Sequence, residues 1–171
     1  MTKRHYTAAL IQALLISLII VTPSFGQGGR GGRGMMGDGA HAADMRLFHQ
    51  LFEHRTEITR QVIAREDGIE TLTESKNPEV TRLLQAHVAS MLARVKEGRP
   101  IHQRDPLFVE LFKNADQIVA RHEPTAGGVR VIETSKDAYV VKLLQAHAEV
   151  VSAFLANGMQ EMMKDHPLPP R

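Results

Sequence analysis

Residues 68–98 read GIETLTESKNPEVTRLLQAHVASMLARVKEG, and residues 128–158, 60 positions further along the chain, read GVRVIETSKDAYVVKLLQAHAEVVSAFLANG. Eleven of the 31 aligned positions are identical without a gap, and five of these form the block LLQAH, which ends at His87 in one stretch and at His147 in the other. The same shift superposes apolar residues that precede the two stretches. Chance similarity does not extend over so many positions, so the sequence indicates an internal duplication. The two copies occupy residues 45–98 and 105–158.

Both copies show the same order of local patterns. Apolar residues spaced three and four apart predict an amphipathic first helix. A glycine then ends the helical pattern, and a short run rich in β-branched residues predicts one strand. A capped apolar stripe predicts the second helix. We therefore expect helices at 44–64, 78–96, 106–122 and 138–162, and strands at 69–74 and 129–134.

One strand per copy cannot satisfy its own backbone donors and acceptors, so we expect the two strands to pair antiparallel. The expected fold is mostly α, with duplicated helix-strand-helix units that form a four-helix domain and a small two-stranded ribbon around a pseudo-two-fold axis. This single domain spans 44–163, which is long enough to bury a core without metal or disulfides. The three prolines near the end predict a flexible tail at 164–171.

The first 43 residues carry two different compositions. A basic start, an apolar run of about 15 residues and a small-residue ending predict a secretory signal peptide at 1–26, because the run is shorter than the roughly 20 residues of a membrane span. Retention of the signal as a membrane anchor is the alternative. Residues 27–43 are rich in glycine and predict a disordered leader, since they cannot bury enough apolar surface to fold. The sequence therefore predicts a periplasmic or secreted protein with no stable membrane span after signal removal.

The composition excludes several classes of function. The 21 Lys and Arg exceed the 19 Asp and Glu by two, and Lys3 and Arg4 in the signal account for that excess. This balance argues against a protein that binds nucleic acid by neutralising its phosphates, which needs a basic face. The chain contains no Cys, which excludes disulfides, thiolate metal sites and covalent haem attachment. We find no catalytic motif such as GxSxG, HExxH or a phosphate-binding loop. Catalysis is therefore undecided, and a non-enzymatic role is favoured.

The repeated histidines are the main candidate site. His87 and His147 lie within the apolar stripes of the two second helices, near their midpoints. A neutral imidazole on an apolar face needs hydrogen-bond partners or a metal. A duplicated domain can bring two equivalent imidazoles together at its axis, as helical bundles do when they build metal or haem sites. The alternative is that each histidine is a satisfied core residue kept for packing.

Three further residues are weaker metal-ligand candidates, because the duplication does not repeat them. Met91 lies one helical turn after His87 and would suit copper, but its counterpart is a valine. His54 flanks the apolar stripe of the predicted helix 44–64, and His122 closes the stripe of the predicted helix 106–122; their counterparts are Asn114 and Val62. A site that used any of the three would be asymmetric.

The sequence thus predicts a small exported binding protein that holds a transition metal or a non-covalent haem through His87 and His147. Copper, zinc and b-type haem are the candidate cofactors, and an envelope redox or metal-handling protein is the candidate partner. The alternative is a metal-free protein–protein interaction module of the cell envelope. No family with established chemistry is recognised behind these motifs.

Overall fold

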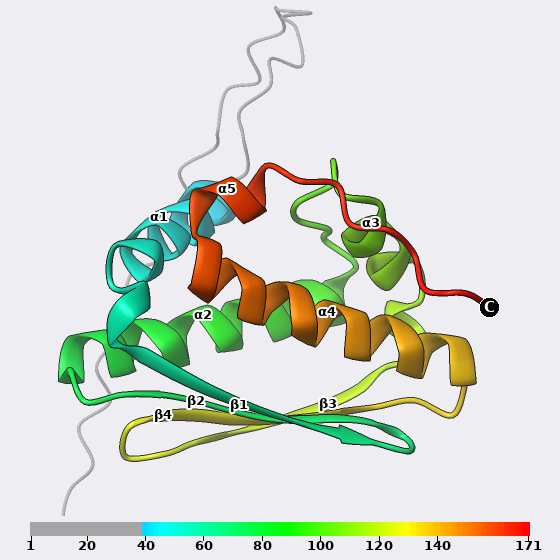
Figure 1. Ribbon diagram of the computed structural model, residues 1–171, viewed down its shortest axis with the longest axis horizontal. Coiled ribbons are helices and arrows are strands. Elements are labelled where there is room, and N and C mark those ends of the chain that lie inside the picture. The colour runs from blue at the N-terminus through cyan, green and yellow to red at the C-terminus, as the bar shows by residue number, and fades with distance from the viewer. Residues whose placement is uncertain (1–38) are drawn as a thin grey trace, which may run out of the picture. The chain divides into compact units, whose positions relative to one another are not determined.

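The computed structural model describes residues 39–171, so the expected signal peptide and most of the expected leader lie outside the described residues. The helices are α1 (Gly39–Glu53), α2 (Pro78–Glu97), α3 (Pro106–Lys113), α4 (Ala138–Asn157) and α5 (Met159–Met162), with short 3-10 turns η1 (Arg55–Glu57) and η2 (Ala115–Gln117). The strands are β1 (Ile58–Arg65), β2 (Gly68–Ser75), β3 (Val119–Pro124) and β4 (Gly128–Thr134). Each copy therefore contributes a helix, a β-hairpin and a second helix (Figure 1).

The expected four-helix domain with a two-stranded ribbon is wrong. The strands form one four-stranded antiparallel sheet in the order β1-β2-β4-β3, and residues 39–171 contain five α-helices. The segments expected at 69–74 and 129–134 pair with each other as the central strands β2 and β4. The two outer strands replace the second halves of the helices that we expected at 44–64 and 106–122. The helix expected at 138–162 is interrupted at Gly158, whose φ is 64°.

The outer strands were mistaken for helix because they lie at the edges of the sheet. Ile58 and Val62 are four residues apart, a spacing that fits a helix with one buried face. In β1, however, only Ile58 and Arg60 are partly covered, and the other six residues are exposed. A strand with so little burial does not show the apolar alternation that identifies strands, although its pairing with β2 satisfies its backbone groups.

The strand register follows the duplication. In the central pair, Thr71 lies opposite Val131, which is its own counterpart in the second copy, so the pseudo-two-fold axis passes between these two residues. Gly68 and Gly128 stand at equivalent places where β2 and β4 approach each other closely. A Cβ atom on Gly68 would lie 1.9 Å from the Glu133 carbonyl oxygen, and one on Gly128 would lie 2.0 Å from the Thr73 carbonyl oxygen. The repeated glycines therefore permit the central pairing.

Helices α2 and α4 lie across the same face of the sheet, and each packs on the central strand of the other copy (Figure 1). The repeated glutamines of the LLQAH blocks hold each helix on the hairpin of the other copy. Gln85 of α2 donates hydrogen bonds to carbonyl oxygens of the β3–β4 hairpin, at 3.1 Å and 2.9 Å. Gln145 of α4 donates to the Arg65 carbonyl oxygen of the β1–β2 hairpin at 3.1 Å. The two copies are thus interlocked in one core.

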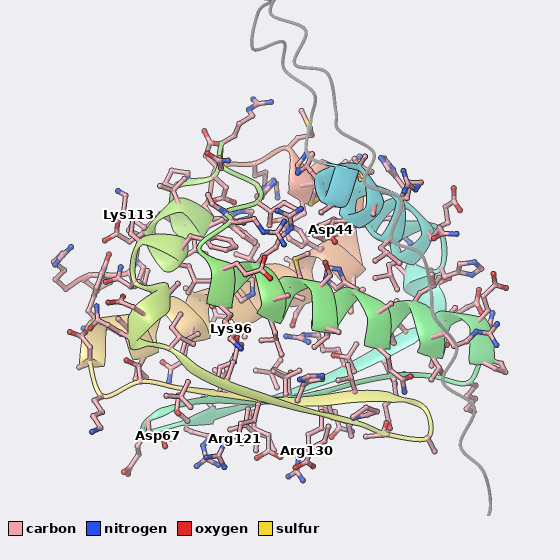
Figure 2. The ribbon with its side chains drawn as sticks, turned by 180° about the vertical axis from the view of Figure 1, so that it is seen from behind. Asp44, Asp67, Lys96, Lys113, Arg121 and Arg130 are labelled. Carbon is pink, nitrogen blue, oxygen red and sulfur yellow. The ribbon has the colours of Figure 1, made fainter. Side chains whose placement is uncertain are left out.

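The other face of the sheet is not covered by any described helix. Asp67, Arg121 and Arg130 project from it, away from α2 and α4 (Figure 2). Arg130 forms an ion pair with Glu70, its own counterpart in the first copy. An antiparallel sheet with one solvated face is common, because only one face is needed for the core.

Among the described helices, α4 alone has the length and apolar composition of a membrane span. Several of its side chains belong to the largest cluster of buried apolar residues, as in a core helix of a globular domain. The segment that we expected to be a flexible tail contacts α3 and α4. Lys142 donates a hydrogen bond to the Pro170 carbonyl oxygen at 3.1 Å, and Arg171 pairs with Glu110 at 3.3 Å.

Candidate functional site

A cavity lies between the sheet and the helices that cover it. One part, of about 170 Å³, is bounded by α1, α2 and α4 and by the strands β1, β2 and β4. A second part, of about 470 Å³, adjoins it and is bounded by the first helices of both copies and by the loop that joins the copies. Helices α2 and α4 make little direct contact with each other, which leaves this space between them. The two parts share these residues: Phe48, His87, Met91, Leu92, Glu133, His147, Val151 and Phe154.

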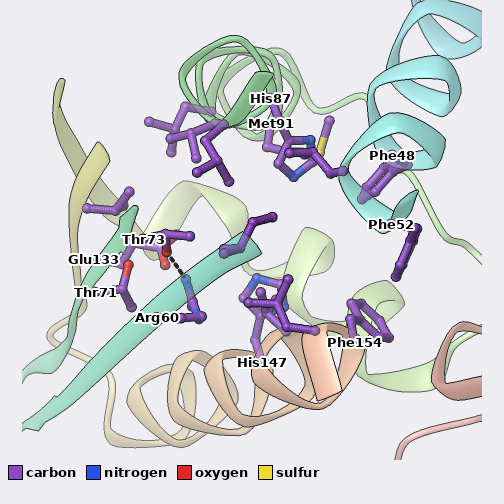
Figure 3. Close-up of a pocket in the computed structure, with 18 residues that line it drawn as sticks. Phe48, Phe52, Arg60, Thr71, Thr73, His87, Met91, Glu133, His147 and Phe154 are labelled. Carbon is purple, nitrogen blue, oxygen red and sulfur yellow. Dashed lines mark hydrogen bonds between the residues drawn. The ribbon is translucent and has the colours of Figure 1, made fainter. Parts of the chain in front are cut away.

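The two repeated histidines face this cavity from α2 and α4 (Figure 3). Their surroundings follow the symmetry of the fold. The His87 ring packs against Phe48 with 4.7 Å between ring centroids, and the His147 ring packs against Phe108, the counterpart of Phe48, at 5.1 Å. The Nδ1 atom of each histidine is buried without a hydrogen-bond partner among the described residues. The sequence placed both side chains on buried faces, and the structure brings them to one cavity.

Both imidazoles are neutral at neutral pH. Burial lowers the pKa of His87 to about 4, although Asp44 opposes this shift. Burial, followed by the Arg60 guanidinium, lowers the pKa of His147 to about 4, and His87 adds to the same effect. A neutral imidazole has a free lone pair on one nitrogen, which is the form that binds metals. The cavity therefore holds the two rings in the ligating state.

Of the weaker candidates, the structure brings only Met91 to the histidines. Met91 lines both parts of the cavity beside His87. His54 lies after the end of α1, and its Nδ1 is 2.7 Å from a Glu57 carboxylate oxygen. His122 is exposed on the edge strand β3. His54 and His122 therefore lie outside the group around the cavity.

The sheet supplies two charged groups to the cavity that the sequence analysis did not single out. The Arg60 side chain of β1 donates a hydrogen bond from Nη1 to Thr73 Oγ1 at 2.7 Å, while its Nε is buried without an acceptor (Figure 3). Glu133 of β4 lines both parts of the cavity. Burial lowers the pKa of Arg60 to about 10 and raises the pKa of Glu133, and each group opposes the shift of the other. The sequence could have pointed to both residues as differences between the copies, because the counterpart of Arg60 is Ala120 and the counterpart of Glu133 is Thr73.

A buried ion pair fixes α1 over the cavity. Asp44, which is 2% exposed, accepts hydrogen bonds from Arg94 and Ser90 of α2. Burial alone would raise the pKa of Asp44, but the bonds from Ser90 and Arg94 outweigh it, and the pKa is lowered. Because α1 carries Phe48, this pair holds in place the ring against which His87 packs.

A second polar cluster holds the C-terminal segment against α3. The His166 Nδ1 lies 2.5 Å from a carboxylate oxygen of Asp105, and its Nε2 lies 3.2 Å from Glu161. Asp105 also caps α3 by accepting a hydrogen bond from the Leu107 amide at 3.0 Å. Burial lowers the pKa of His166, but the bonds to the two carboxylates outweigh it and raise the pKa. Lys164, Asn157 and His166 together lower the pKa of Glu161 to about 2. Both ring nitrogens of His166 have carboxylate partners, so this cluster serves to hold the C-terminal segment against α3.

His102 lies between this cluster and the cavity. Its ring packs on Phe108 with 4.8 Å between centroids. Its φ of 57° is the one positive value among the described residues other than glycine. Its Nε2 is buried, 3.6 Å from an Asp105 oxygen, and burial lowers its pKa. His102 therefore forms part of the cavity wall.

The chemistry of the site follows from its donor set. No three His, Asp or Glu side chains within residues 39–171 are grouped closely enough to hold a metal ion. A bare zinc ion takes four ligands, and the cavity offers two imidazoles and the Met91 thioether. No protein-family model matches this chain, and no match is found among curated proteins or solved structures. The cavity is therefore the feature of the chain that bears most on its function.

Proposed function

We propose that this protein is a small exported haem-binding protein, and that His87 and His147 are the two axial ligands of a b-type haem in the central cavity. One observation carries the proposal. Two equivalent imidazoles face one apolar cavity from two helices, and each has a buried Nδ1 without a hydrogen-bond partner. A pair of core histidines kept only for packing would be expected to have partners for these atoms.

Haem suits a two-imidazole site better than a bare ion does. The porphyrin itself supplies four of the six iron ligands, so the protein needs to add only two. Copper or zinc would need further ligands that the described residues do not group around the histidines. The apolar and aromatic walls suit the flat face of a porphyrin, and the cavity that α2 and α4 line offers space for it. When bound, a six-coordinate haem would supply one-electron transfer, and an envelope redox protein would be the partner.

The experiment is a titration of the purified chain with b-type haem, Cu(II) and Zn(II), followed by absorption spectra and thermal unfolding. We expect one haem per chain and a rise in the melting temperature, because a ligand that binds only the folded state stabilises it. His87→Ala and His147→Ala should each weaken haem binding strongly, whereas His49→Ala, at an exposed position of α1, should leave it unchanged. Binding that is equal in all four proteins would contradict the assignment of the ligands.

The outer face of the sheet favours one alternative, the metal-free interaction module. Ile63 and Val119 are each 57% exposed there. If neither haem nor either metal ion changes the spectrum or the melting temperature, the cavity is not a cofactor site and this alternative remains.

Export is part of the proposal and rests on the basic start, apolar run and small residues of segment 1–26. The intact mass of protein from the envelope fraction of its native host tests it. We expect a chain that begins at or near Gln27, and a chain that begins at Met1 in the membrane fraction would show that the signal is retained.

A further inference from the structure

The Arg60 side chain is a partly buried cation that forms no ion pair with the residues that the structure describes. Its Nη1 donates a hydrogen bond to Thr73 Oγ1 at 2.7 Å, and its Nε has no acceptor among the described residues. No carboxylate within residues 39–171 forms an ion pair with it. Holding a charged group partly out of water is unfavourable unless a partner compensates it, so the fold alone does not explain a guanidinium with a buried, unpartnered Nε at this place.

Packing does not require an arginine at this place. The counterpart of Arg60 in the second copy is Ala120, which occupies the equivalent position on β3 against the same kind of helix pair. The duplicated fold therefore accepts a methyl group where the first copy has a guanidinium. The difference between the copies indicates a role that is specific to one end of the cavity.

Glu133 does not neutralise Arg60 directly. The two residues lie on opposite sides of the pseudo-two-fold axis, in strands that β2 separates, and the Thr71–Val131 pair lies between them. They are close enough to influence each other electrostatically but not to form an ion pair. Burial raises the pKa of the Glu133 carboxyl, which weakens its charge as a partner for Arg60.

We propose that the ligand of this cavity carries a carboxylate on an apolar body, and that Arg60 binds this carboxylate at the sheet end of the cavity. This inference deepens the proposed function and rests on it. Phe48, Phe52 and Phe154 line the same cavity and would contact the apolar body (Figure 3). The guanidinium has unused donors in a planar arrangement that matches a carboxylate, and such charge-assisted bonds are the stronger kind. Haem propionates and fatty acids share this chemistry.

The experiment compares each acid with a neutral analogue on the same mature chain. The probes are b-type haem against its dimethyl ester, followed by absorption, and dodecanoate against dodecanol, followed by calorimetry. We expect the wild-type protein to bind the acid of a pair roughly tenfold or more tightly, which is the contribution of one hydrogen bond to a charged group. Arg60→Met should abolish this preference with little effect on the neutral analogue, and Arg60→Lys should retain part of it. Arg121→Met, on the outer face of the sheet, is the matched control and should behave as wild type.

The outcomes separate this inference from the proposed function. If haem does not bind but dodecanoate is preferred to dodecanol through Arg60, the haem assignment fails and the carboxylate site stands. If haem binds through the histidines and its dimethyl ester binds equally well, the proposed function stands and the carboxylate site is overturned. The wild-type protein alone can overturn the carboxylate site: it does so if it binds the acid and the neutral analogue equally well, or if it binds no acid. If Arg60 only compensates Glu133, then Glu133→Gln should restore the stability of Arg60→Met, and neither change should alter the acid preference.

Discussion

Acidification should destabilise this protein through the two cavity imidazoles. Each has a pKa of about 4 in the folded chain against an ordinary value of 6.5. A lowered folded-state pKa means that the unfolded chain takes up protons first as the pH falls. The stability is therefore full above pH 6.5 and is lost progressively between pH 6.5 and about 4. At pH 5 the loss is about 2 kcal/mol for each imidazole, which is a large share of a typical stability of roughly 5–15 kcal/mol.

The assay is urea unfolding of the ligand-free protein at pH 7 and pH 5, followed by circular dichroism. We expect the loss of unfolding free energy between the two pH values to shrink by about 2 kcal/mol in His87→Leu and again in His147→Leu, since leucine does not titrate. The exposed His49→Leu is the control and should show the wild-type loss. All other titratable groups are present in every one of these proteins, so the comparison isolates the effect of the replaced histidine. If both cavity variants lose as much stability as wild type, the imidazoles are not held neutral by burial and the reasoning is refuted.

Three further predictions concern the framework of the site. Asp44→Asn should destabilise the chain by roughly 3–5 kcal/mol, because it leaves Arg94 buried beside a neutral side chain, and a loss below about 1 kcal/mol in urea unfolding would show that the pair is unimportant. Gly68→Ala should prevent the normal β2–β4 pairing, since its Cβ would lie 1.9 Å from the Glu133 carbonyl oxygen, and unchanged hydrogen exchange of the β4 amides would count against this. His166→Gln should remove a contribution that is present below pH 6.5 and is lost as the pH rises through the raised folded-state pKa, so wild type and variant should differ more at pH 6 than at pH 9 in thermal unfolding.

The second helices and the central strands could be predicted from the duplication, because both copies repeat the residues that face the shared core. The sequence placed the second helices at 78–96 and 138–162, and α2 and α4 begin at Pro78 and Ala138. It did not predict β1 and β3, because an edge strand such as Ile58–Arg65 is exposed over most of its length and has no apolar alternation to read. The change from helix to strand occurs at a 3-10 turn, which has no strong sequence signal.

Of the candidate site, the sequence pointed mainly to the residues that the duplication repeats. His87 and His147 were found because the repeat preserves them within apolar stripes. The cavity between them could not be predicted, since it depends on how α2 and α4 separate over the sheet. Arg60 was placed in a helix by the periodicity, and Glu133 was read as the end of a short strand. Only the paired sheet brings these two charges to the cavity floor.

The optical spectrum of the haem-loaded protein shows whether the two repeated histidines hold one haem. We expect a low-spin, six-coordinate iron at a stoichiometry of one haem per chain, because both imidazoles would bind the metal. We also expect a change to a five-coordinate or high-spin spectrum in His87→Ala and in His147→Ala, and no change in His49→Ala. A high-spin spectrum in the wild type, or a low-spin spectrum that survives both single substitutions, would contradict the claim that the two repeated histidines hold one haem between them.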